Sequence, residues 1–331
     1  MLKKKIGIDL GTSKTVIYSY ENGIVFNEPT IIAIDNISKK LLAIGNEAKL
    51  MLGKTPETVT TVKPIKEGVI ANYKVTQAFL EHIINQYAGN TRFFKPDLYI
   101  SIPVGITSVQ KRAVQEAALG AGAGNVHLIP SPLLAAIGNG MKIFESFGNT
   151  VVSMGGGISE MAVISLGGLV IAQSVQTAGD SINEAIIVLI KKEFGLTIGE
   201  GMADQIKHSI NINNVDESPI EIRGRDSSSG MPRSLMLSKY TVVNTTKQSL
   251  NALILLIRTV LEKTPPELSS DIMDAGIMLT GGSANIPGIT QLLTKAIGVS
   301  FFVPDEPELS VIKGIEKVMK DHSLISGYML I

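Results

Sequence analysis

Short apolar strands that run directly into glycine turns recur along this chain. Each apolar stretch is too short for a helix, and glycine permits a tight reversal of the main chain. Residues 15–20 and 160–166 can return as second strands, and residues 169–175 can follow the latter as a third. The repetition predicts one structural unit used twice, in a two-domain protein built by duplication. The strands and their turns are residues 4–10 with Gly11-Thr12-Ser13, residues 151–154 with Gly155-Gly156-Gly157, and residues 276–280 with Gly281-Gly282-Ser283.

Apolar positions at helical spacing fall between these strands, and such alternation of strands and helices is typical of an α/β fold. A capping-box pattern in Thr107–Gln110 marks the start of one helix. Gly195 and Pro265-Pro266 mark the ends of two others, because glycine suits the position after a helix and proline cannot continue one. The expected helices are residues 107–120, 182–194 and 251–262, with a strand over 98–102 and an exposed hairpin or loop over 216–232.

Composition narrows the range of functions. A length of 331 residues with a hydrophobic fraction of 44% is enough for two domains and a sizeable core. The 30 Lys and Arg residues balance the 30 Asp and Glu residues, so the chain lacks the positive field of a dedicated nucleic-acid-binding protein, and its neutrality favours association. The lack of cysteine excludes disulfides, thiolate metal sites and cysteine nucleophiles. Without a secretory signal or a run of roughly 20 apolar residues, we expect a cytoplasmic protein that can still touch a membrane surface.

The glycine turns predict a phosphate-binding site. Successive backbone N–H groups in such a turn form a concavity of partial positive charge, and glycine lets an anion approach closely. Asp9 stands directly before the first turn, where a carboxylate beside phosphates is best explained by Mg²⁺, and Thr12 and Ser13 add hydroxyl donors. Neither a P-loop nor a GxGxxG pattern is present, which argues against a Walker ATPase and a Rossmann dehydrogenase.

Seven segments resemble the MreB family, the bacterial homologues of actin, and the match extends from the first strand to about residue 319. The TPPEL and EMAVISLGG segments are the most specific to that family. A low arginine content and the lack of tryptophan suggest an AT-rich genome, for which a paralogue from a wall-less helical bacterium would be one source. The seven segments are Ile6–Thr15 (IGIDLGTSKT), Gly23–Thr30 (GIVFNEPT), Gly68–Asn72 (GVIAN), Glu160–Gly168 (EMAVISLGG), Ala178–Asp180 (AGD), Thr264–Leu268 (TPPEL) and Leu279–Gly282 (LTGG).

The resemblance implies a two-lobed actin-like ATPase fold with four subdomains, shared with sugar kinases and heat-shock chaperones. It also implies ATP or ADP with Mg²⁺ in a central cleft, and paired, antiparallel protofilaments that act in cell shape. In a walled cell such filaments would guide wall synthesis, and in a wall-less cell they would support shape or motility. The implied subdomains are IA (1–32, 65–140 and 306–331), IB (33–64), IIA (141–178 and 242–305) and IIB (179–241).

The resemblance also assigns roles to individual positions. Asp9 would hold Mg²⁺, through water. Ser283 departs from the usual third glycine and Asp204 from the usual glutamate, and we expect nucleotide binding to survive both changes. The implied nucleotide-binding residues are Gly11, Thr12, Ser13 and Lys14 in the first turn, Gly155, Gly156 and Gly157 in the second, Gly179 and Asp180 after it, Asp204 and Lys207 at the ribose and base, and Gly281, Gly282, Ser283 and Ala284 at the adenosine.

Three residues differ from the family pattern at positions that would act in the hydrolysis of ATP. Ser131 stands where the family has a glutamate that orients or deprotonates the attacking water. Ser153 replaces an aspartate that helps to hold the water shell of the metal, and Ile158 replaces a threonine beside the γ-phosphate. A serine hydroxyl is no general base at neutral pH, and loss of a positioned base costs about 10²–10⁴ in rate. We therefore expect ATP to be bound but hydrolysed slowly; the alternatives are that another carboxylate substitutes or that the changes are drift in an active enzyme.

Two further questions concern partners. Phe93 and Phe94 lie between Arg92 and Lys95, a pattern that suits shallow insertion into a membrane interface, although one phenylalanine could equally pack inward. In MreB relatives the corresponding loop contacts the membrane. Paralogues are further candidate partners. The competing hypothesis is a monomeric ATPase or kinase of the same superfold, although the chain shows neither a catalytic aspartate for a hydroxyl substrate nor a chaperone's substrate-binding domain.

Overall fold

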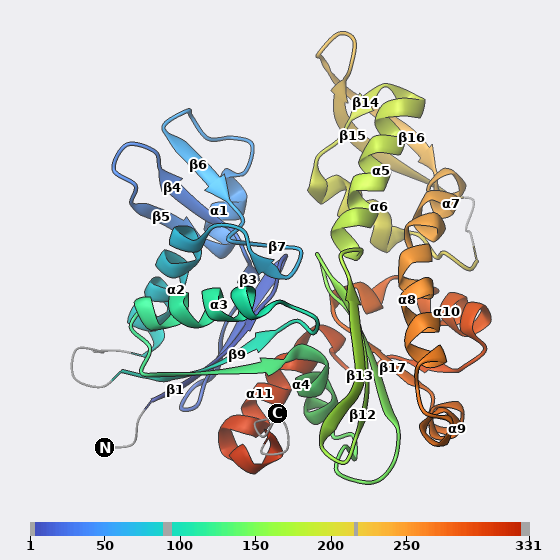
Figure 1. The fold of residues 1–331 in the computed structure, drawn as a ribbon. Helices are drawn as coiled ribbons and strands as arrows, with labels where there is room; N and C mark the ends of the chain where they lie inside the picture. The colour runs from blue at the N-terminus through green and yellow to red at the C-terminus, as the bar shows by residue number, and fades with distance from the viewer. Residues whose placement is uncertain (1–3, 89–94, 215–217, 326–331) are drawn as a thin grey trace.

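The computed structural model, which describes residues 4–88, 95–214 and 218–325, has two lobes (Figure 1). Each lobe is built on a mixed five-stranded sheet. In lobe I the strand order is β10-β9-β1-β2-β3, and in lobe II it is β13-β12-β11-β17-β18. The strands of lobe I are β1 (Lys5–Leu10), β2 (Lys14–Ser19), β3 (Gly23–Pro29), β9 (Asp97–Ile102) and β10 (Asn125–Pro130). The strands of lobe II are β11 (Asn149–Met154), β12 (Ser159–Ser165), β13 (Gly168–Val175), β17 (Ile277–Thr280) and β18 (Phe301–Phe302).

The two sheets have the same topology, as the repeated strand-and-turn pattern predicted. In lobe I, β1 pairs antiparallel with β2 and parallel with β9. In lobe II, β11 pairs antiparallel with β12 and parallel with β17. The first two glycine turns are therefore equivalent hairpin tips, each joining the first two strands of its sheet.

Helices cover the sheets, and smaller sheets extend both lobes at the top of Figure 1. The helices are α1 (Gly45–Met51), α2 (Tyr73–Tyr87), α3 (Ser108–Gly120), α4 (Ser131–Gly138), α5 (Gly179–Phe194), α6 (Glu200–Ser209), α7 (Lys239–Ser249), α8 (Asn251–Glu262), α9 (Pro266–Ala275), α10 (Ile289–Ile297) and α11 (Ser310–Lys320), with short 3-10 turns η1 (Gly282–Asn285), η2 (Pro307–Leu309) and η3 (His322–Ile325). The smaller strands are β4 (Ile32–Asp35), β5 (Leu41–Ile44), β6 (Val59–Val62), β7 (Ile65–Lys66), β8 (Val69–Ile70), β14 (Leu196–Thr197), β15 (Pro219–Asp226) and β16 (Pro232–Ser238).

Most predicted elements are present, with shifts that have local causes. The capping box at Thr107 is formed, and the segment after residue 218 is a hairpin of β15 and β16. Helix α5 begins three residues earlier than its first apolar position, because the Ser181 hydroxyl accepts a hydrogen bond from the Ala178 N–H (2.9 Å). The predicted helices correspond to α3, α5 and α8, and α7 is one of several helices that were not predicted. Pro265-Pro266 ends α8 and also begins α9, since proline suits a first helical turn.

Helices α4 and α11 join the lobes. One apolar cluster includes Val16 of the first sheet, Leu134 of α4, Ile315 of α11, and Val151 and Met278 of the second sheet. The main chain crosses from lobe I to lobe II after α4 and returns before η2, so this cluster lies at the hinge side of the molecule. Gly138 and Gly314 allow the close approach of α4 and α11, because a Cβ at Gly314 would overlap the Leu134 carbonyl.

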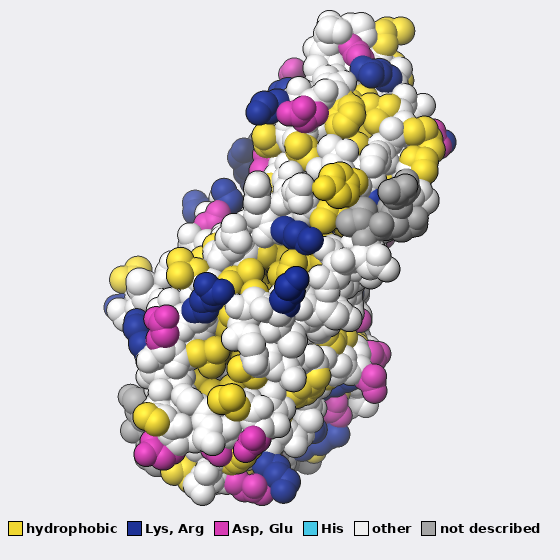
Figure 2. Space-filling view, turned by 90° about the vertical axis from the view of Figure 1, so that its right-hand side faces the viewer, with side chains coloured by type: hydrophobic (Ala, Val, Ile, Leu, Met, Phe, Trp, Pro, Cys, Tyr) yellow, Lys and Arg dark blue, Asp and Glu magenta, His cyan; other side chains and the backbone are white. Residues whose placement is uncertain are grey.

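The surface of lobe II carries both signs of charge. Figure 2 shows Lys and Arg side chains interspersed with Asp and Glu, between patches of apolar side chains. This distribution agrees with the balanced charge of the sequence. Within the part of the chain that the structure describes, none of the helices has the length and apolarity needed to span a bilayer.

The contact between α4 and α11 gives a stability test. We expect G314A to lower the free energy of unfolding by about 3 kcal/mol, because the added methyl meets rigid backbone. Gly201 in α6 has no atom within 4 Å of an added Cβ. The matched variant G201A should therefore be as stable as the wild type, or up to about 1 kcal/mol more stable. Urea unfolding measures both, and equal midpoints for the two variants would contradict the packing argument.

Candidate functional site

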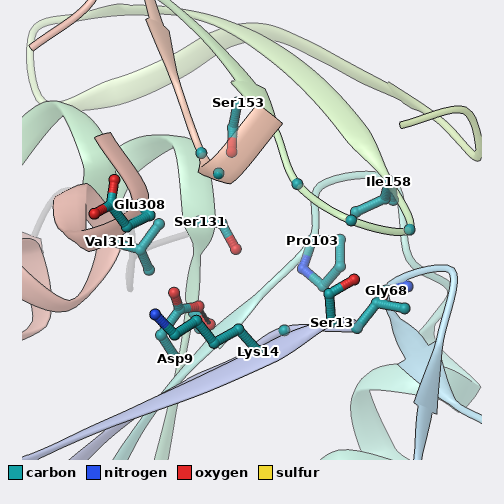
Figure 3. A pocket seen from close by; sticks show the side chains of 18 of the residues that line it. Asp9, Ser13, Lys14, Gly68, Pro103, Ser131, Ser153, Ile158, Glu308 and Val311 are labelled. Atoms are coloured by element: carbon teal, nitrogen blue, oxygen red, sulfur yellow. Dashed lines mark hydrogen bonds between the residues drawn. The ribbon is translucent and has the colours of Figure 1, made fainter. Parts of the chain in front are cut away.

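The three glycine turns converge on one cavity between the lobes. The cavity has a volume of about 170 Å³, and in Figure 3 Asp9 and Lys14 lie across it from Ser153. Glu308 and Val311 lie at one end, and Pro103 and Ile158 at the other. The predicted site residues that line it are Asp9, Gly11, Thr12, Ser13, Lys14, Ser131, Ser153, Gly155, Gly156, Gly157, Ile158, Gly281 and Gly282.

The second turn is anchored so that its N–H groups face the cavity. The Gly155 carbonyl accepts a hydrogen bond from the Gly179 N–H (3.1 Å), and the Gly156 carbonyl accepts one from the Asp180 N–H (2.7 Å). In a planar trans peptide the C=O and the following N–H point in opposite directions. Because these two carbonyls are directed at the start of α5, the N–H groups of Gly156 and Gly157 point the other way, toward the cavity that both glycines line.

The two equivalent hairpin tips touch across the cleft. A Cβ at Gly156 would collide with the Ser13 side chain, and one at Gly157 would collide with Thr12, so only glycine permits this approach. The Ser13 hydroxyl donates to Asp180 Oδ1 (2.9 Å), which links lobe I to lobe II. Thr12 Oγ1 accepts a hydrogen bond from the Gly68 N–H (2.9 Å), which fixes the first tip within its own lobe.

Asp9 is the carboxylate at the end of β1. Its Oδ1 accepts a hydrogen bond from the Ser101 hydroxyl (2.7 Å). Burial raises the pKa of Asp9 to about 6, and the Ser101 hydrogen bond acts against this rise. Among the described residues no group of three or more His, Asp and Glu side chains could hold a metal ion by itself. A single carboxylate nevertheless fits Mg²⁺, which usually keeps several waters and takes phosphate oxygens as further ligands.

The three positions at which the resemblance implies a departure from the family all border the cavity. The Ser131 hydroxyl donates to the Ile102 carbonyl (3.1 Å), so its proton is already engaged. Ser153 is buried. Ile158 places an apolar side chain beside Gly68, with 3.1 Å between its Cγ2 and a Cβ built at that glycine. None of these three side chains can accept a proton from water at neutral pH.

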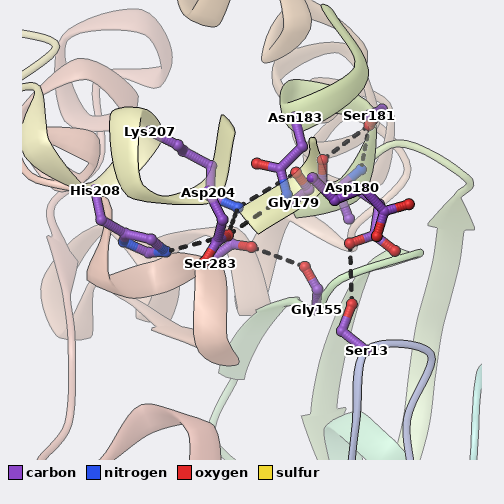
Figure 4. Close-up of polar contacts among 12 residues, drawn as sticks. Ser13, Gly155, Gly179, Asp180, Ser181, Asn183, Asp204, Lys207, His208 and Ser283 are labelled. Atoms are coloured by element: carbon purple, nitrogen blue, oxygen red, sulfur yellow. Dashed lines mark hydrogen bonds and ion pairs between the residues drawn. The ribbon is translucent and has the colours of Figure 1, made fainter. Parts of the chain in front are cut away.

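A second polar cluster lies beside the cavity (Figure 4). The buried Lys207 Nζ lies 2.7 Å from Asp204 Oδ1 and 3.4 Å from the Gly179 carbonyl, to which it donates. The Ser283 hydroxyl donates to the Gly155 carbonyl (2.8 Å) and so joins the third turn to the second. The cluster holds the predicted residues Gly179, Asp180, Asp204, Lys207 and Ser283, with Ala284 buried next to Ser283.

Two sets of residues differ from the predicted site: one lies outside the described residues, and the other lines the cavity without having been predicted. Phe93 and Phe94 lie outside the described residues. The cavity lining also includes residues to which the sequence assigned no role: Glu160, Glu308, Ser101, Gly68 and Pro103. Of these, Glu160 carried a signal, because it is the one carboxylate in the segment that begins at Ser153 and continues through the second turn.

Glu160 is a buried carboxyl group with one firm partner. Its side chain is 3% exposed, and its Oε1 accepts a hydrogen bond from the Val104 N–H (2.7 Å). The pKa of Glu160 is raised to about 8, mainly by burial. The hydrogen bond from the Val104 N–H acts against this rise, and the charge of the nearby Asp9 adds to it. Glu160 is therefore mostly protonated at neutral pH in the closed cleft.

This raised pKa predicts a pH dependence of stability. Between pH 4.5 and 8 the unfolded chain releases the Glu160 proton while the folded chain keeps it, so the stability contributed by this group falls as pH rises through that window. E160Q lacks this ionisation, and with it the repulsion between the charges of Glu160 and Asp9. We expect E160Q to gain a few kcal/mol relative to the wild type between pH 5 and pH 8.5, at 1.36 kcal/mol per pKa unit. Urea midpoints that stay parallel across this range would refute the prediction.

Comparison with known proteins agrees with this arrangement. Residues 3–326 match the family model described as MreB/Mbl protein. The chain is 42% identical to the cell shape-determining protein Mbl of Bacillus subtilis over 309 residues, 93% of both chains. It is 39% identical to the cell shape-determining protein MreB of Escherichia coli over 328 residues, which are 97% of this chain and 94% of that protein.

Solved structures give the same result. The crystal structure of MreB5 of Spiroplasma citri bound to AMPPNP matches with a TM-score of 0.91 and 30% identity, over 98% of both chains. The MamK double helical filament matches with a TM-score of 0.80 at 17% identity, over 97% of this chain and 99% of that one, and shows the fold alone. The two lobes have the same topology, their glycine tips face each other across a cleft, and the family model matches almost the whole chain. This chain therefore belongs to the MreB/Mbl family of bacterial actin homologues.

Proposed function

We propose that this chain binds ATP or ADP with Mg²⁺ in the cleft and assembles into filaments that act in cell shape. The observation that carries the proposal is the pair of glycine tips, one from each lobe, with main-chain N–H groups of the second directed into the cavity. Relatives named as cell shape-determining proteins and an MreB5 structure with bound AMPPNP support it. The filaments are proposed to be paired and antiparallel, cytoplasmic and peripheral to the membrane, which Phe93 and Phe94 would contact.

Different residues of the cleft would bind different parts of the nucleotide. The tips at Gly11–Lys14 and Gly155–Gly157 would hold the phosphates, and the cluster around Asp204 and Lys207 the ribose and base. Asp9 would hold Mg²⁺ through water, and the ion would neutralise charge that develops on the phosphates. Because the tips touch in this structure, a triphosphate enters only when the lobes part.

Hydrolysis is proposed to be slow because binding of ATP and its cleavage depend on different atoms. Binding of the phosphates comes largely from main-chain N–H groups, which the sequence changes leave in place. Cleavage needs a side chain that positions and deprotonates water, and Ser131, Ser153 and Ile158 do not supply one. The carboxyl of Glu160 lines the cavity but is held by Val104 and mostly protonated near pH 7.

Restoring a carboxylate at position 131 tests this. We expect S131E to raise phosphate release by up to about tenfold, short of full recovery because Ser153 and Ile158 remain. S131A is the matched control and should match the wild type. Phosphate release would be measured at saturating ATP beside Bacillus subtilis Mbl, and an equal rate for the wild type and Mbl would disprove slow hydrolysis.

Assembly is tested separately. In the presence of ATP and Mg²⁺ we expect the purified protein to sediment and to form paired filaments by electron microscopy. Without nucleotide, little should pellet, since no ligand then bridges the two lobes. A protein that binds ATP but stays monomeric at every concentration would favour the monomeric ATPase or kinase of the same superfold.

A further inference from the structure

A row of polar side chains crosses the sheet of lobe II beneath the cavity. Thr280 of β17 pairs with Ser153 of β11, Ser153 with Glu160 of β12, and Glu160 with Ser174 of β13. Directly paired residues in a sheet project their side chains from the same face. The four side chains therefore lie side by side on one face, although their positions in the sequence are far apart.

Both ends of the row bind lobe I. At one end, Thr280 Oγ1 lies 2.7 Å from the Pro307 carbonyl and 2.6 Å from the Ser310 hydroxyl. At the other end, the row engages both polar groups of one peptide residue. The Val104 N–H donates to Glu160 Oε1 (2.7 Å), and the Val104 carbonyl accepts from the Ser174 hydroxyl (3.0 Å).

The two ends lie on opposite sides of the cavity. Pro307 and Ser310 adjoin Glu308 and Val311, close to where the chain returns from lobe II to lobe I, so their lobe cannot move far from Thr280. Val104 follows Pro103, which lies at the other end of the cavity in Figure 3. Among the described residues no chain crossing joins the lobes on that side, so contacts such as those of Val104 hold it closed.

We propose that Glu160 is a positioning residue that, together with Ser174, grips the backbone of Val104 and so slows the release of nucleotide from the closed cleft. These three residues form the Val104 clasp, and the inference rests on the proposed nucleotide site. What the clasp needs from residue 160 is an oxygen that accepts a hydrogen bond, because the N–H of Val104 is the donor. A carboxylate charge is not required.

The clasp also connects the cleft to α3. Val104 is followed by Gly105, whose φ of +77° lies in the left-handed region, and then by the capping box at Thr107. Only one residue, Ile106, separates this glycine from the helix cap. When the clasp opens, the start of α3 is therefore free to move with the segment that leads to it.

The test measures release of a fluorescent ADP analogue from the full chain by stopped flow at pH 7. E160A and S174A each remove one hydrogen bond of the clasp, and each should release the analogue about 2–12 times faster, the fold-change of a net hydrogen bond. E160Q keeps the acceptor oxygen and should stay within about twofold of the wild type. I257V, a small truncation in the core of lobe II away from the cleft, controls for lost stability and should release at the wild-type rate.

Hydrogen exchange of the Val104 amide, measured without nucleotide, reports directly whether the hydrogen bond from Val104 to residue 160 is formed. The amide should be protected in the wild type and in E160Q, and it should exchange at least several times faster in E160A. If E160A does not fold, S174A still tests the clasp. Ser174 does not line the cavity, so its replacement removes a hydrogen bond of the clasp without changing the cavity lining.

Each contrary result has its own meaning. If E160A and S174A release the analogue as slowly as the wild type, the clasp is wrong while the nucleotide site stands. If E160Q behaves like E160A, or if E160Q abolishes phosphate release, Glu160 acts through its charge and the positioning role is overturned. If the wild type binds no analogue, the proposed function fails, and amide exchange still decides whether the clasp exists.

Discussion

The contact between two glycine hairpin tips, one from each lobe, is the constraint on which the rest of this structure depends. The tips can meet only because Gly156 and Gly157 have no side chain to collide with Ser13 and Thr12. The hydrogen bonds from the start of α5 to the Gly155 and Gly156 carbonyls turn the following N–H groups of the same turn toward the cavity. Closure of the lobes and the proposed binding of phosphates therefore depend on the same short turn.

In the proposed function, nucleotide binding and nucleotide cleavage depend on different parts of this site, so that one can change without the other. Main-chain donors are independent of side-chain identity as long as the turn stays tight. The residues that act on water are side chains, and each can be replaced singly. In this chain Ser131 and Ser153 fill their positions without a titratable group, and two of the carboxyls that line the cavity, Asp9 and Glu160, have pKa values raised by burial.

Holding the cleft closed requires contacts on the side away from the hinge. Helices α4 and α11 form an apolar joint between the sheets, which resists their separation. The hydrogen bonds from Ser13 to Asp180 and from Val104 to Glu160 act on the side where the described chain does not cross. A few polar bonds are suited to this role, because they can be broken and remade at small cost whenever the lobes part.

Much of this protein follows from local sequence, because its determinants are local. The hairpins around Gly11 and Gly155 and the capped start of α3 depend on turn and capping residues only a few positions apart. Most of the site residues that the motif resemblance implied line the cavity, because they belong to these local turns. The start of α5 was missed because its cap is unusual, and α7, one of several helices that were not predicted, is weakly amphipathic and leaves little periodic signal.

Tertiary structure alone decided which side chains meet. Thr280, Ser153, Glu160 and Ser174 form one row because parallel and antiparallel pairing sets their register, and no spacing in the sequence encodes that register. The grip of Glu160 on Val104 joins residues 56 positions apart in different lobes. A carboxyl group in a motif can be read from the sequence, but its burial, its partner and its pKa depend on what the other lobe brings against it.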